Sequence, residues 1–139
     1  MPIPPIQVFV VDDEPSVCTS YARLLRSARI QAQTFLSVEE LLRADLSGQN
    51  TCIVSDVRMP GISGLALPAL LAEAGHRIPV IFVTAHDSPD MPRTAQQAGA
   101  IAYFCKPVDD RVLLDAIAEA IDSTSTPPRF SPPPQHEPR

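Results

Sequence analysis

The chain has 139 residues, of which 45% are hydrophobic, and its formal net charge at pH 7 is −5. This length suits one domain, and this share of hydrophobic residues excludes a chain that is disordered throughout. Lysine and arginine form no cluster along the sequence. Direct nucleic-acid binding is therefore not expected, because contacts to phosphates require clustered cations.

The cysteines and the apolar runs indicate a cytoplasmic protein. Cys18, Cys52 and Cys105 lie far apart, without the spacing of a metal site. We expect them to be reduced thiols of the core, as in most cytosolic proteins. The first residues lack the basic region of a signal peptide. No apolar run approaches the roughly 18 residues that a membrane helix needs, so no membrane contact is expected.

Strands and helices are predicted to alternate along the chain. Short runs of branched apolar residues predict buried strands, and apolar residues three and four apart predict helices. The expected strands are 6–11, 31–35, 51–56, 79–84 and 101–104. The expected helices are 15–28, 37–46, 63–74, a short one that ends near residue 99, and a last one that includes 112–121.

Capping residues and a proline mark the expected starts of three helices. Asp13 or Glu14 can cap the first helix, and Ser37 with Glu40 forms a capping-box pattern at the second. Pro68 lies near the start of the third helix, where we expect a local distortion because proline has no backbone N–H.

Five strand–helix units with short connections predict an α/β fold with a parallel sheet covered on both faces. We expect a flavodoxin-like, doubly wound (βα)5 sheet with the strand order 2-1-3-4-5. Residues 6–123 would form this domain, after an N-terminal arm of residues 1–5. The proline-rich residues 124–139 would be a tail or the start of a linker.

Polar residues follow four of the predicted strands. Asp12 and Asp13 follow the first strand and Asp56 ends the third. Thr84 ends the fourth, and Lys106, the only lysine in the chain, follows the fifth. The carboxyl ends of parallel strands lie along one edge of a sheet, where such sheets bind ligands. We therefore expect these five residues to meet in one crevice.

The chemistry of this set is narrow. Clustered carboxylates repel one another unless a cation joins them, and their hard oxygens suit Mg²⁺. Lys106 can bind a phosphoryl group as a point charge, and the Thr84 hydroxyl can donate to a phosphoryl oxygen. Asp56 could be a nucleophile that becomes an aspartyl phosphate. Each residue alone could be a helix cap or a solvated charge, but their joint placement favours a site.

Four motifs carry a family resemblance: "VVDDEPSV", "IVSDVRMPGISGL", "PVIFVTAH" and "YFCKPV". Together they resemble the receiver domain of two-component response regulators, over roughly residues 6–123. The wording "MPGISGL", "HRIPVIFVTAHD" and "KPVDD" is most similar to the FixJ-like subgroup, whose members often carry a C-terminal DNA-binding domain. The resemblance implies that Asp56 accepts a phosphoryl group from a sensor histidine kinase or a phosphotransfer protein.

The resemblance also implies a metal site and a switch. Asp12, Asp13, Asp56 and the backbone carbonyl of Arg58 would bind Mg²⁺. Thr84 and Lys106 would contact the phosphoryl oxygens, and the Lys106–Pro107 peptide bond would be cis. Tyr103 would be the switch aromatic, which turns inward when Thr84 moves toward the phosphoryl group. The remaining position of interest, His86, would modulate dephosphorylation together with Arg58.

The switch implies a contact surface. It would be built from the short helix before residue 99, the strand 101–104 and the last helix. An output protein or domain would bind there, and a phosphorylation-dependent homodimer could form.

Three interpretations of the whole protein stay open. The first is a single-domain receiver or phosphorelay shuttle, and the second is the receiver part of a FixJ-like transcription regulator. Both are signalling phosphoacceptors rather than enzymes, although they promote their own phosphotransfer and autodephosphorylation. The third is a small Mg-dependent phosphatase with an aspartyl nucleophile. It would require a "DxD" motif and a substrate cap, whereas Asp12 and Asp13 are adjacent and no cap insertion occurs.

Overall fold

Five parallel strands form one sheet in the order β2-β1-β3-β4-β5 in the computed structural model, which describes residues 5–85 and 88–122. The predicted doubly wound sheet and its strand order are thereby confirmed. The strands are β1 (Gln7–Val11), β2 (Gln31–Phe35), β3 (Thr51–Ser55), β4 (Val80–Thr84) and β5 (Ala102–Cys105). The helices are α1 (Pro15–Ser27), α2 (Val38–Leu42), the 3₁₀ turn η1 (Gly64–Ala66), α3 (Leu67–Glu73), α4 (Met91–Ala98) and α5 (Asp110–Asp122).

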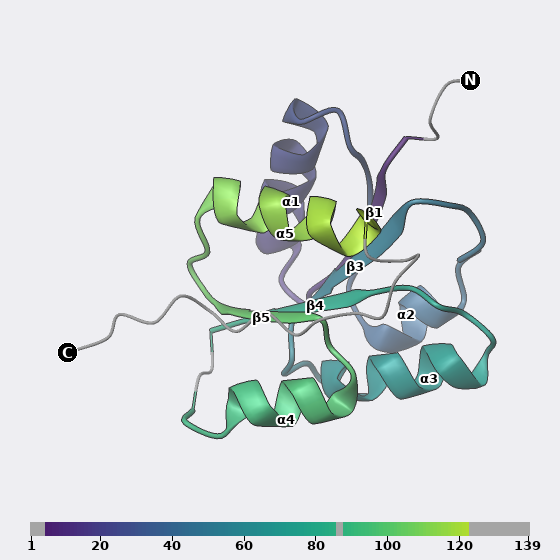
Figure 1. The fold of residues 1–139 in the computed structure, drawn as a ribbon, viewed down its shortest axis with the longest axis vertical. Helices are drawn as coiled ribbons and strands as arrows, with labels where there is room; N and C mark the ends of the chain where they lie inside the picture. Colours follow the sequence, from purple (N-terminus) through teal and green to yellow (C-terminus); the bar gives the residue numbers. More distant parts are fainter. Residues whose placement is uncertain (1–4, 86–87, 123–139) are drawn as a thin grey trace.

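The sheet separates two hydrophobic cores. Helices α1 and α5 cover one face, and α2, α3 and α4 cover the other (Figure 1). Val8 lies in the first core and Phe9 in the second, because successive side chains of a strand point to opposite faces. Every residue of β3 and β4 is buried, as expected for strands in the middle of a parallel sheet.

The start of α1 differs from the prediction that Asp13 or Glu14 caps it. Glu14 holds the N-cap position, but its side chain makes no capping hydrogen bond. Its longer side chain is a poor cap compared with that of Asp or Ser. The carboxylate of Asp12 instead accepts a hydrogen bond from Glu14 N at 2.9 Å. Asp12 therefore joins the end of β1 to the beginning of α1.

Helix α2 begins as predicted but ends earlier. Ser37 Oγ accepts from Glu40 N at 3.0 Å, which confirms the predicted cap. The helix ends at Leu42 rather than at residue 46. Beyond that end, Asp45 Oδ1 accepts hydrogen bonds from both the N–H and the hydroxyl of Ser47. Such local bonds offer the backbone an alternative to the helix.

The predicted distortion near Pro68 is confirmed. The 3₁₀ turn η1 precedes α3, and Pro68 lies in the first turn of α3, where its missing N–H has no helical partner to lose. Ser63 Oγ accepts from Leu65 N at 3.1 Å and caps η1. These local bonds place η1 directly after the loop that leaves β3.

The predicted N-terminal arm (residues 1–5) and proline-rich tail (residues 124–139) lie mostly outside the described part of the chain, as does His86. Within the described residues, no helix has the length and apolarity needed to cross a membrane.

Candidate functional site

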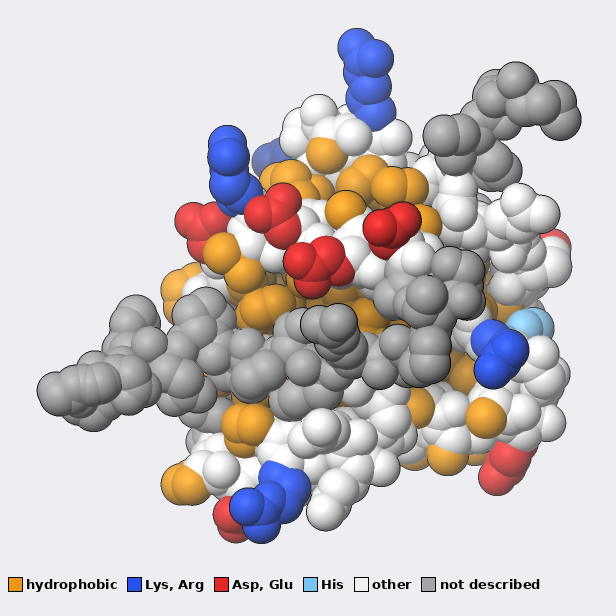
Figure 2. Space-filling model, viewed as in Figure 1, with side chains coloured by type: hydrophobic (Ala, Val, Ile, Leu, Met, Phe, Trp, Pro, Cys, Tyr) orange, Lys and Arg blue, Asp and Glu red, His pale blue; other side chains and the backbone are white. Residues whose placement is uncertain are grey.

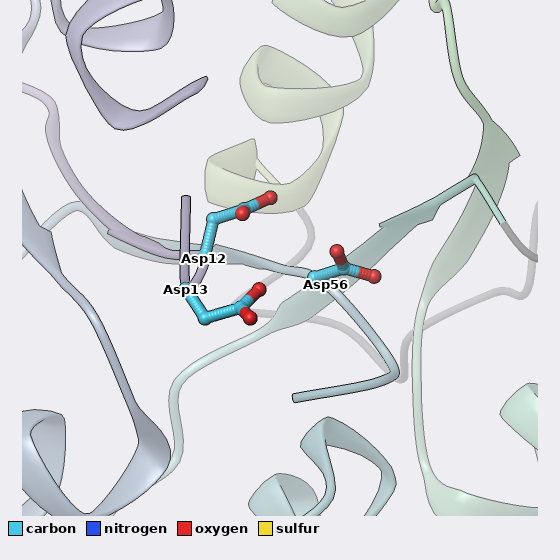
Figure 3. A group of neighbouring side chains, drawn as sticks. All are labelled: Asp12, Asp13 and Asp56. Carbon is cyan, nitrogen blue, oxygen red and sulfur yellow. The ribbon is translucent and has the colours of Figure 1, made fainter. Parts of the chain in front are cut away.

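Three carboxylates converge where β1 and β3 end (Figure 3). Asp12 and Asp13 follow β1, and Asp56 follows β3. One carboxylate oxygen from each lies within 4.8 Å of the others. Asp12 and Asp56 are buried, whereas Asp13 is exposed to solvent. The sheet edge thus holds a concentrated negative charge with one side open to solvent.

Lys106 compensates this charge. Its Nζ lies 2.7 Å from Asp12 Oδ2 and 3.2 Å from Asp56 Oδ2. Partial burial acts to lower the pKa of Lys106, but the hydrogen bond that Lys106 donates to Asp12 and the charges of Asp56 and Asp12 outweigh it. The pKa of Lys106 is therefore raised above its usual value. The Lys106 ammonium is therefore charged in the folded protein at neutral pH.

Backbone groups orient the two buried carboxylates. Val57 N donates to Asp56 Oδ1 at 2.7 Å, and Glu14 N donates to Asp12 Oδ1 at 2.9 Å. The second oxygen of each carboxylate meets Lys106. A carboxylate held by a backbone N–H and an ammonium has a fixed direction, so the Asp56 carboxylate is pre-oriented within the cluster.

The backbone of Asp56 is also tightly held. Its N–H donates to Val11 O at 2.9 Å, and its carbonyl accepts from Ser55 Oγ at 2.8 Å. Gly64 packs against that carbonyl, and a Cβ at residue 64 would overlap the Asp56 oxygen. Gly64 was not among the residues expected at the site, and its only signal in the sequence is its position at the end of "GISG".

The segment 57–64 leads from Asp56 to Gly64, the first residue of η1. Val57 O accepts from Gly64 N at 2.9 Å and from Ser63 Oγ at 3.1 Å, which closes the base of the loop. Arg58 lies within this loop with its side chain exposed. We refer to residues 57–64 as the acceptor loop.

Thr84 ends β4, the strand next to β3, and Tyr103 lies within β5. Both are fully buried, and Tyr103 pairs with Phe82 in the second core. The carbonyl of Thr84 accepts from Lys106 N at 2.8 Å, so the two residues lie on adjoining strands at the same edge. The Lys106–Pro107 peptide bond is cis, as the resemblance implied.

A groove of about 500 Å³ adjoins Lys106. Its walls come from α1 and from the segment between β5 and α5, and it is lined by Ser16, Val17, Ser20, Tyr21, Lys106, Pro107 and Val108. Burial raises the pKa of Tyr21 to about 12, an effect that the charge of Lys106 opposes and the charges of Asp12 and Asp56 reinforce. The sequence did not reveal this groove, because its two walls are nearly ninety residues apart.

The donor set fits a hard divalent cation. Three carboxylates whose oxygens approach within 4.8 Å offer only oxygen ligands. Mg²⁺ prefers such ligands and usually keeps several waters, which suits a site with one open side. Asp12, Asp13 and Asp56 are therefore able to hold a metal ion.

Comparisons with known proteins agree on one family. The family model described as response regulator receiver domain matches residues 8–118. The transcriptional regulatory protein TdiR of Thauera aromatica is 42% identical over 114 residues, covering 82% of this chain and 50% of the relative. The transcriptional regulatory protein FixJ of Azorhizobium caulinodans is 35% identical over 116 residues, covering 84% of this chain and 55% of the relative.

Solved structures give the same result. The crystal structure of FixJ-N has a TM-score of 0.78 and 32% identity, covering 86% of this chain and 96% of that one. The response regulator StyR has a TM-score of 0.78 and 39% identity, covering 88% of this chain and 62% of that one. The chain spans about half the length of the curated relatives it matches.

Proposed function

The chain belongs to the response regulator receiver domain family, and we propose that it is the phosphoacceptor of a two-component or phosphorelay system. A sensor histidine kinase or a phosphotransfer protein would supply the phosphoryl group, and Asp56 would accept it. The observation that carries this proposal is that Lys106 bridges Asp56 and a second buried carboxylate, Asp12, beside the exposed Asp13 at the sheet edge.

In the proposed transfer, a carboxylate oxygen of Asp56 forms a bond to phosphorus as the P–N bond of a phosphohistidine breaks. The leaving imidazole nitrogen keeps the electron pair of that bond and takes up a proton. The N–H of Val57 holds one Asp56 oxygen, which fixes the carboxylate for attack. Lys106 Nζ, already 3.2 Å from Asp56, would follow the negative charge onto the phosphoryl oxygens.

The metal ion is the second part of the proposal. Asp12, Asp13, Asp56 and the backbone carbonyl of Arg58 would hold Mg²⁺. When bound, Mg²⁺ supplies positive charge that offsets both the carboxylates and the incoming phosphoryl group. The oxygen-only donor set supports this choice over a soft transition metal.

The third part is a switch that begins at Thr84. Phosphorylation adds about −1.5 to −2 charges, and the Thr84 hydroxyl would turn to donate to the new oxygens. Tyr103, whose side chain is already fully buried in the second core, would occupy the space that Thr84 leaves. In the other state of the switch the Tyr103 ring would point outward. The two states would then differ in how α4 packs on β5.

The output surface would consist of α4, β5 and α5. Figure 2 shows acidic side chains along the exposed side of α5, and Asp110, Asp115 and Glu119 are exposed there. An output protein or domain with a basic contact surface would complement this charge. The named relatives are transcriptional regulatory proteins, so an attached or separate transcriptional output is the form of the proposal that they support. A phosphorylation-dependent homodimer through the same surface is compatible with it.

The deciding experiment is intact-mass analysis after incubation with Mg²⁺ and a small phosphoryl donor. We expect one phosphate adduct that hydroxylamine removes, as is typical of an acyl phosphate. The adduct should be absent in Asp56→Asn and unchanged in Asp115→Asn, a matched control on the exposed side of α5. The proposal fails if the wild-type protein stays unmodified with both a small donor and a cognate kinase, or if Asp56→Asn still carries the adduct. Continuous hydrolysis of a small phosphate ester would favour the phosphatase interpretation instead.

A further inference from the structure

Glu39 of α2 contacts the acceptor loop across 23 residues of sequence. Its Oε2 accepts a hydrogen bond from Ile62 N at 3.4 Å, which is long for an N–H···O bond. The loop is therefore held at two places. Hydrogen bonds to Val57 O close its base, and Glu39 contacts its tip.

Gly61 allows the carboxylate of Glu39 to lie directly on the loop backbone. A Cβ at residue 61 would lie 2.7 Å from Glu39 Oε2 and 3.4 Å from its Cδ and Oε1. The φ of Gly61 is +82°, a conformation that other residues rarely adopt. Two separate constraints thus require glycine at the point where Glu39 touches the loop.

The second oxygen of Glu39 is unusual. Among the described residues, Oε1 is the one buried side-chain nitrogen or oxygen with no hydrogen-bond partner. A buried acceptor without a partner costs free energy, and an apolar side chain of similar shape would avoid that cost. The carboxylate at residue 39 is therefore poorly explained by stability alone, which points to a role in the site.

The acceptor loop connects this contact to the metal ligands. Val57 orients Asp56 through its N–H, and the neighbouring Arg58 carries the carbonyl proposed as a ligand. Displacement of the tip at Gly61 and Ile62 would move this short, closed loop as a unit. We propose that Glu39 is a positioning residue, which braces the acceptor loop from α2 and thereby sets the affinity of the site for Mg²⁺. This inference rests on the proposed function for the identity of the metal.

The test compares three variants by NMR titration with Mg²⁺ alone and by hydrogen exchange of the loop amides in metal-free protein. Glu39→Ala removes the brace, and we expect about ten-fold weaker Mg²⁺ binding, near the low end for residues that orient metal ligands. The Ile62 amide should also exchange faster. Glu39→Gln keeps the shape and the acceptor oxygen, so its affinity should stay within about two-fold of the wild type. Glu40→Ala weakens the start of α2 without touching the loop, and its Mg²⁺ affinity should be unchanged.

Several results would overturn the inference. If Glu39→Gln loses as much affinity as Glu39→Ala, the effect is one of charge rather than of position. If Glu40→Ala loses as much, the effect is one of helix stability. Unchanged affinity in Glu39→Ala, or no Mg²⁺ binding by the wild type, also refutes it. Should Glu39→Ala fail to fold, Glu39→Met keeps the apolar stem and takes its place.

The titration contains no phosphoryl donor, so its result is independent of Asp56 phosphorylation. A wild-type protein that binds Mg²⁺ but forms no adduct would refute the proposed function and still decide the role of Glu39.

Discussion

Lys106 Nζ lies 2.7 Å from Asp12 Oδ2, although the two residues are 94 positions apart in the chain. The exposed fractions of the two side chains are 18% and 2%, so water screens this ion pair only in part. Asp56 shares the same ammonium at 3.2 Å. One lysine therefore offsets much of the repulsion within a carboxylate cluster that the fold itself creates.

Removal of this ammonium should destabilise the protein. We expect Lys106→Met to lower the free energy of unfolding by about 1–3 kcal/mol, somewhat less than for a fully buried pair because Lys106 is partly exposed. Mg²⁺ should recover more stability in the variant than in the wild type, since it replaces the lost charge. Urea unfolding with and without Mg²⁺ measures both effects.

The pH dependence of this effect follows from the raised pKa of Lys106. A raised folded-state pKa gives stability that is fully present below the unfolded value, about 10.4, and is lost only at higher pH. The loss in Lys106→Met should thus be equal at pH 6 and pH 8. Arg111→Met, which removes an exposed cation from α5, is the control and should change stability by less than about 0.5 kcal/mol. If Mg²⁺ stabilised Lys106→Met and the wild type equally, this would contradict the prediction that Mg²⁺ replaces the lost charge of Lys106.

Thr84→Val should separate phosphorylation from the switch. The substitution keeps the side-chain volume and removes the hydroxyl, so we expect Asp56 to be phosphorylated about ten-fold more slowly. That is a smaller loss than for a sole oxyanion donor, because Lys106 remains. Phosphorylation should change hydrogen exchange of the α4 amides in the wild type but not in Thr84→Val. Thr94→Val, a control within α4, should respond like the wild type. The same exchange response in Thr84→Val would show that the Thr84 hydroxyl does not drive the switch.

The convergence of Asp12, Asp56 and Lys106 could be predicted because it depends on regular structure. Apolar runs located the strands, and parallel strands place their carboxyl ends along one edge. Right-handed connections restrict the possible strand orders, and 2-1-3-4-5 is one of the two common orders of doubly wound sheets. Residues that directly follow a strand therefore have predictable positions even when they are far apart in sequence.

The contacts of Glu39 and Gly64 could not be predicted, because they depend on the acceptor loop. That loop has no periodic pattern, and its path is fixed by bonds between its own ends, such as those to Val57 O. The early end of α2 was missed for a similar reason. There, the local bonds of Asp45 outweigh an apolar pattern that would have continued the helix.

Gly64→Ala tests how closely η1 must approach Asp56. A Cβ at residue 64 would overlap a backbone oxygen and lie 3.0 Å from Ser55 Oγ, so the loop or the strand end must move. We expect a loss of about 1–3 kcal/mol in stability and much slower phosphorylation of Asp56. Gly48→Ala introduces strain through its φ of +127° but meets no atom closer than 3.8 Å. It should lose some stability and be phosphorylated normally, and similar phosphorylation rates in the two variants would refute the prediction.

The end of α1 offers a stabilising substitution. Arg29 has a φ of 63°, and its N–H donates to Arg26 O while Ile30 N donates to Leu25 O, a helix end that usually carries glycine. The left-handed conformation costs a residue with a Cβ about 1–2 kcal/mol, and glycine recovers less than this because its unfolded state is more flexible. Arg29→Gly should therefore raise the unfolding free energy by about 0.5–1 kcal/mol.

Gly75 provides the reciprocal case for that prediction. It ends α3 with a φ of 86°, and nothing lies within 4 Å of the position of its missing Cβ. Gly75→Ala should lower stability by a similar amount, through backbone conformation alone. Chemical denaturation measures both variants, and changes of the same sign in the two would contradict the argument.

Tyr21 predicts how stability responds to alkaline pH. Burial raises its pKa to about 12, so the folded state favours the neutral phenol. In the unfolded chain a tyrosine ionises near pH 10. The contribution of the neutral Tyr21 phenol to folding stability is therefore fully present below pH 10 and is lost as the pH rises toward 12. The chain has two tyrosines, and the difference in phenolate absorbance between the wild type and Tyr21→Phe isolates the first. We expect that difference to have its midpoint near pH 12, and the urea midpoint of the wild type to fall more steeply than that of Tyr21→Phe above pH 10. A difference centred near pH 10 would mean that water reaches the phenol freely, and that the groove beside Lys106 is more open than the structure indicates.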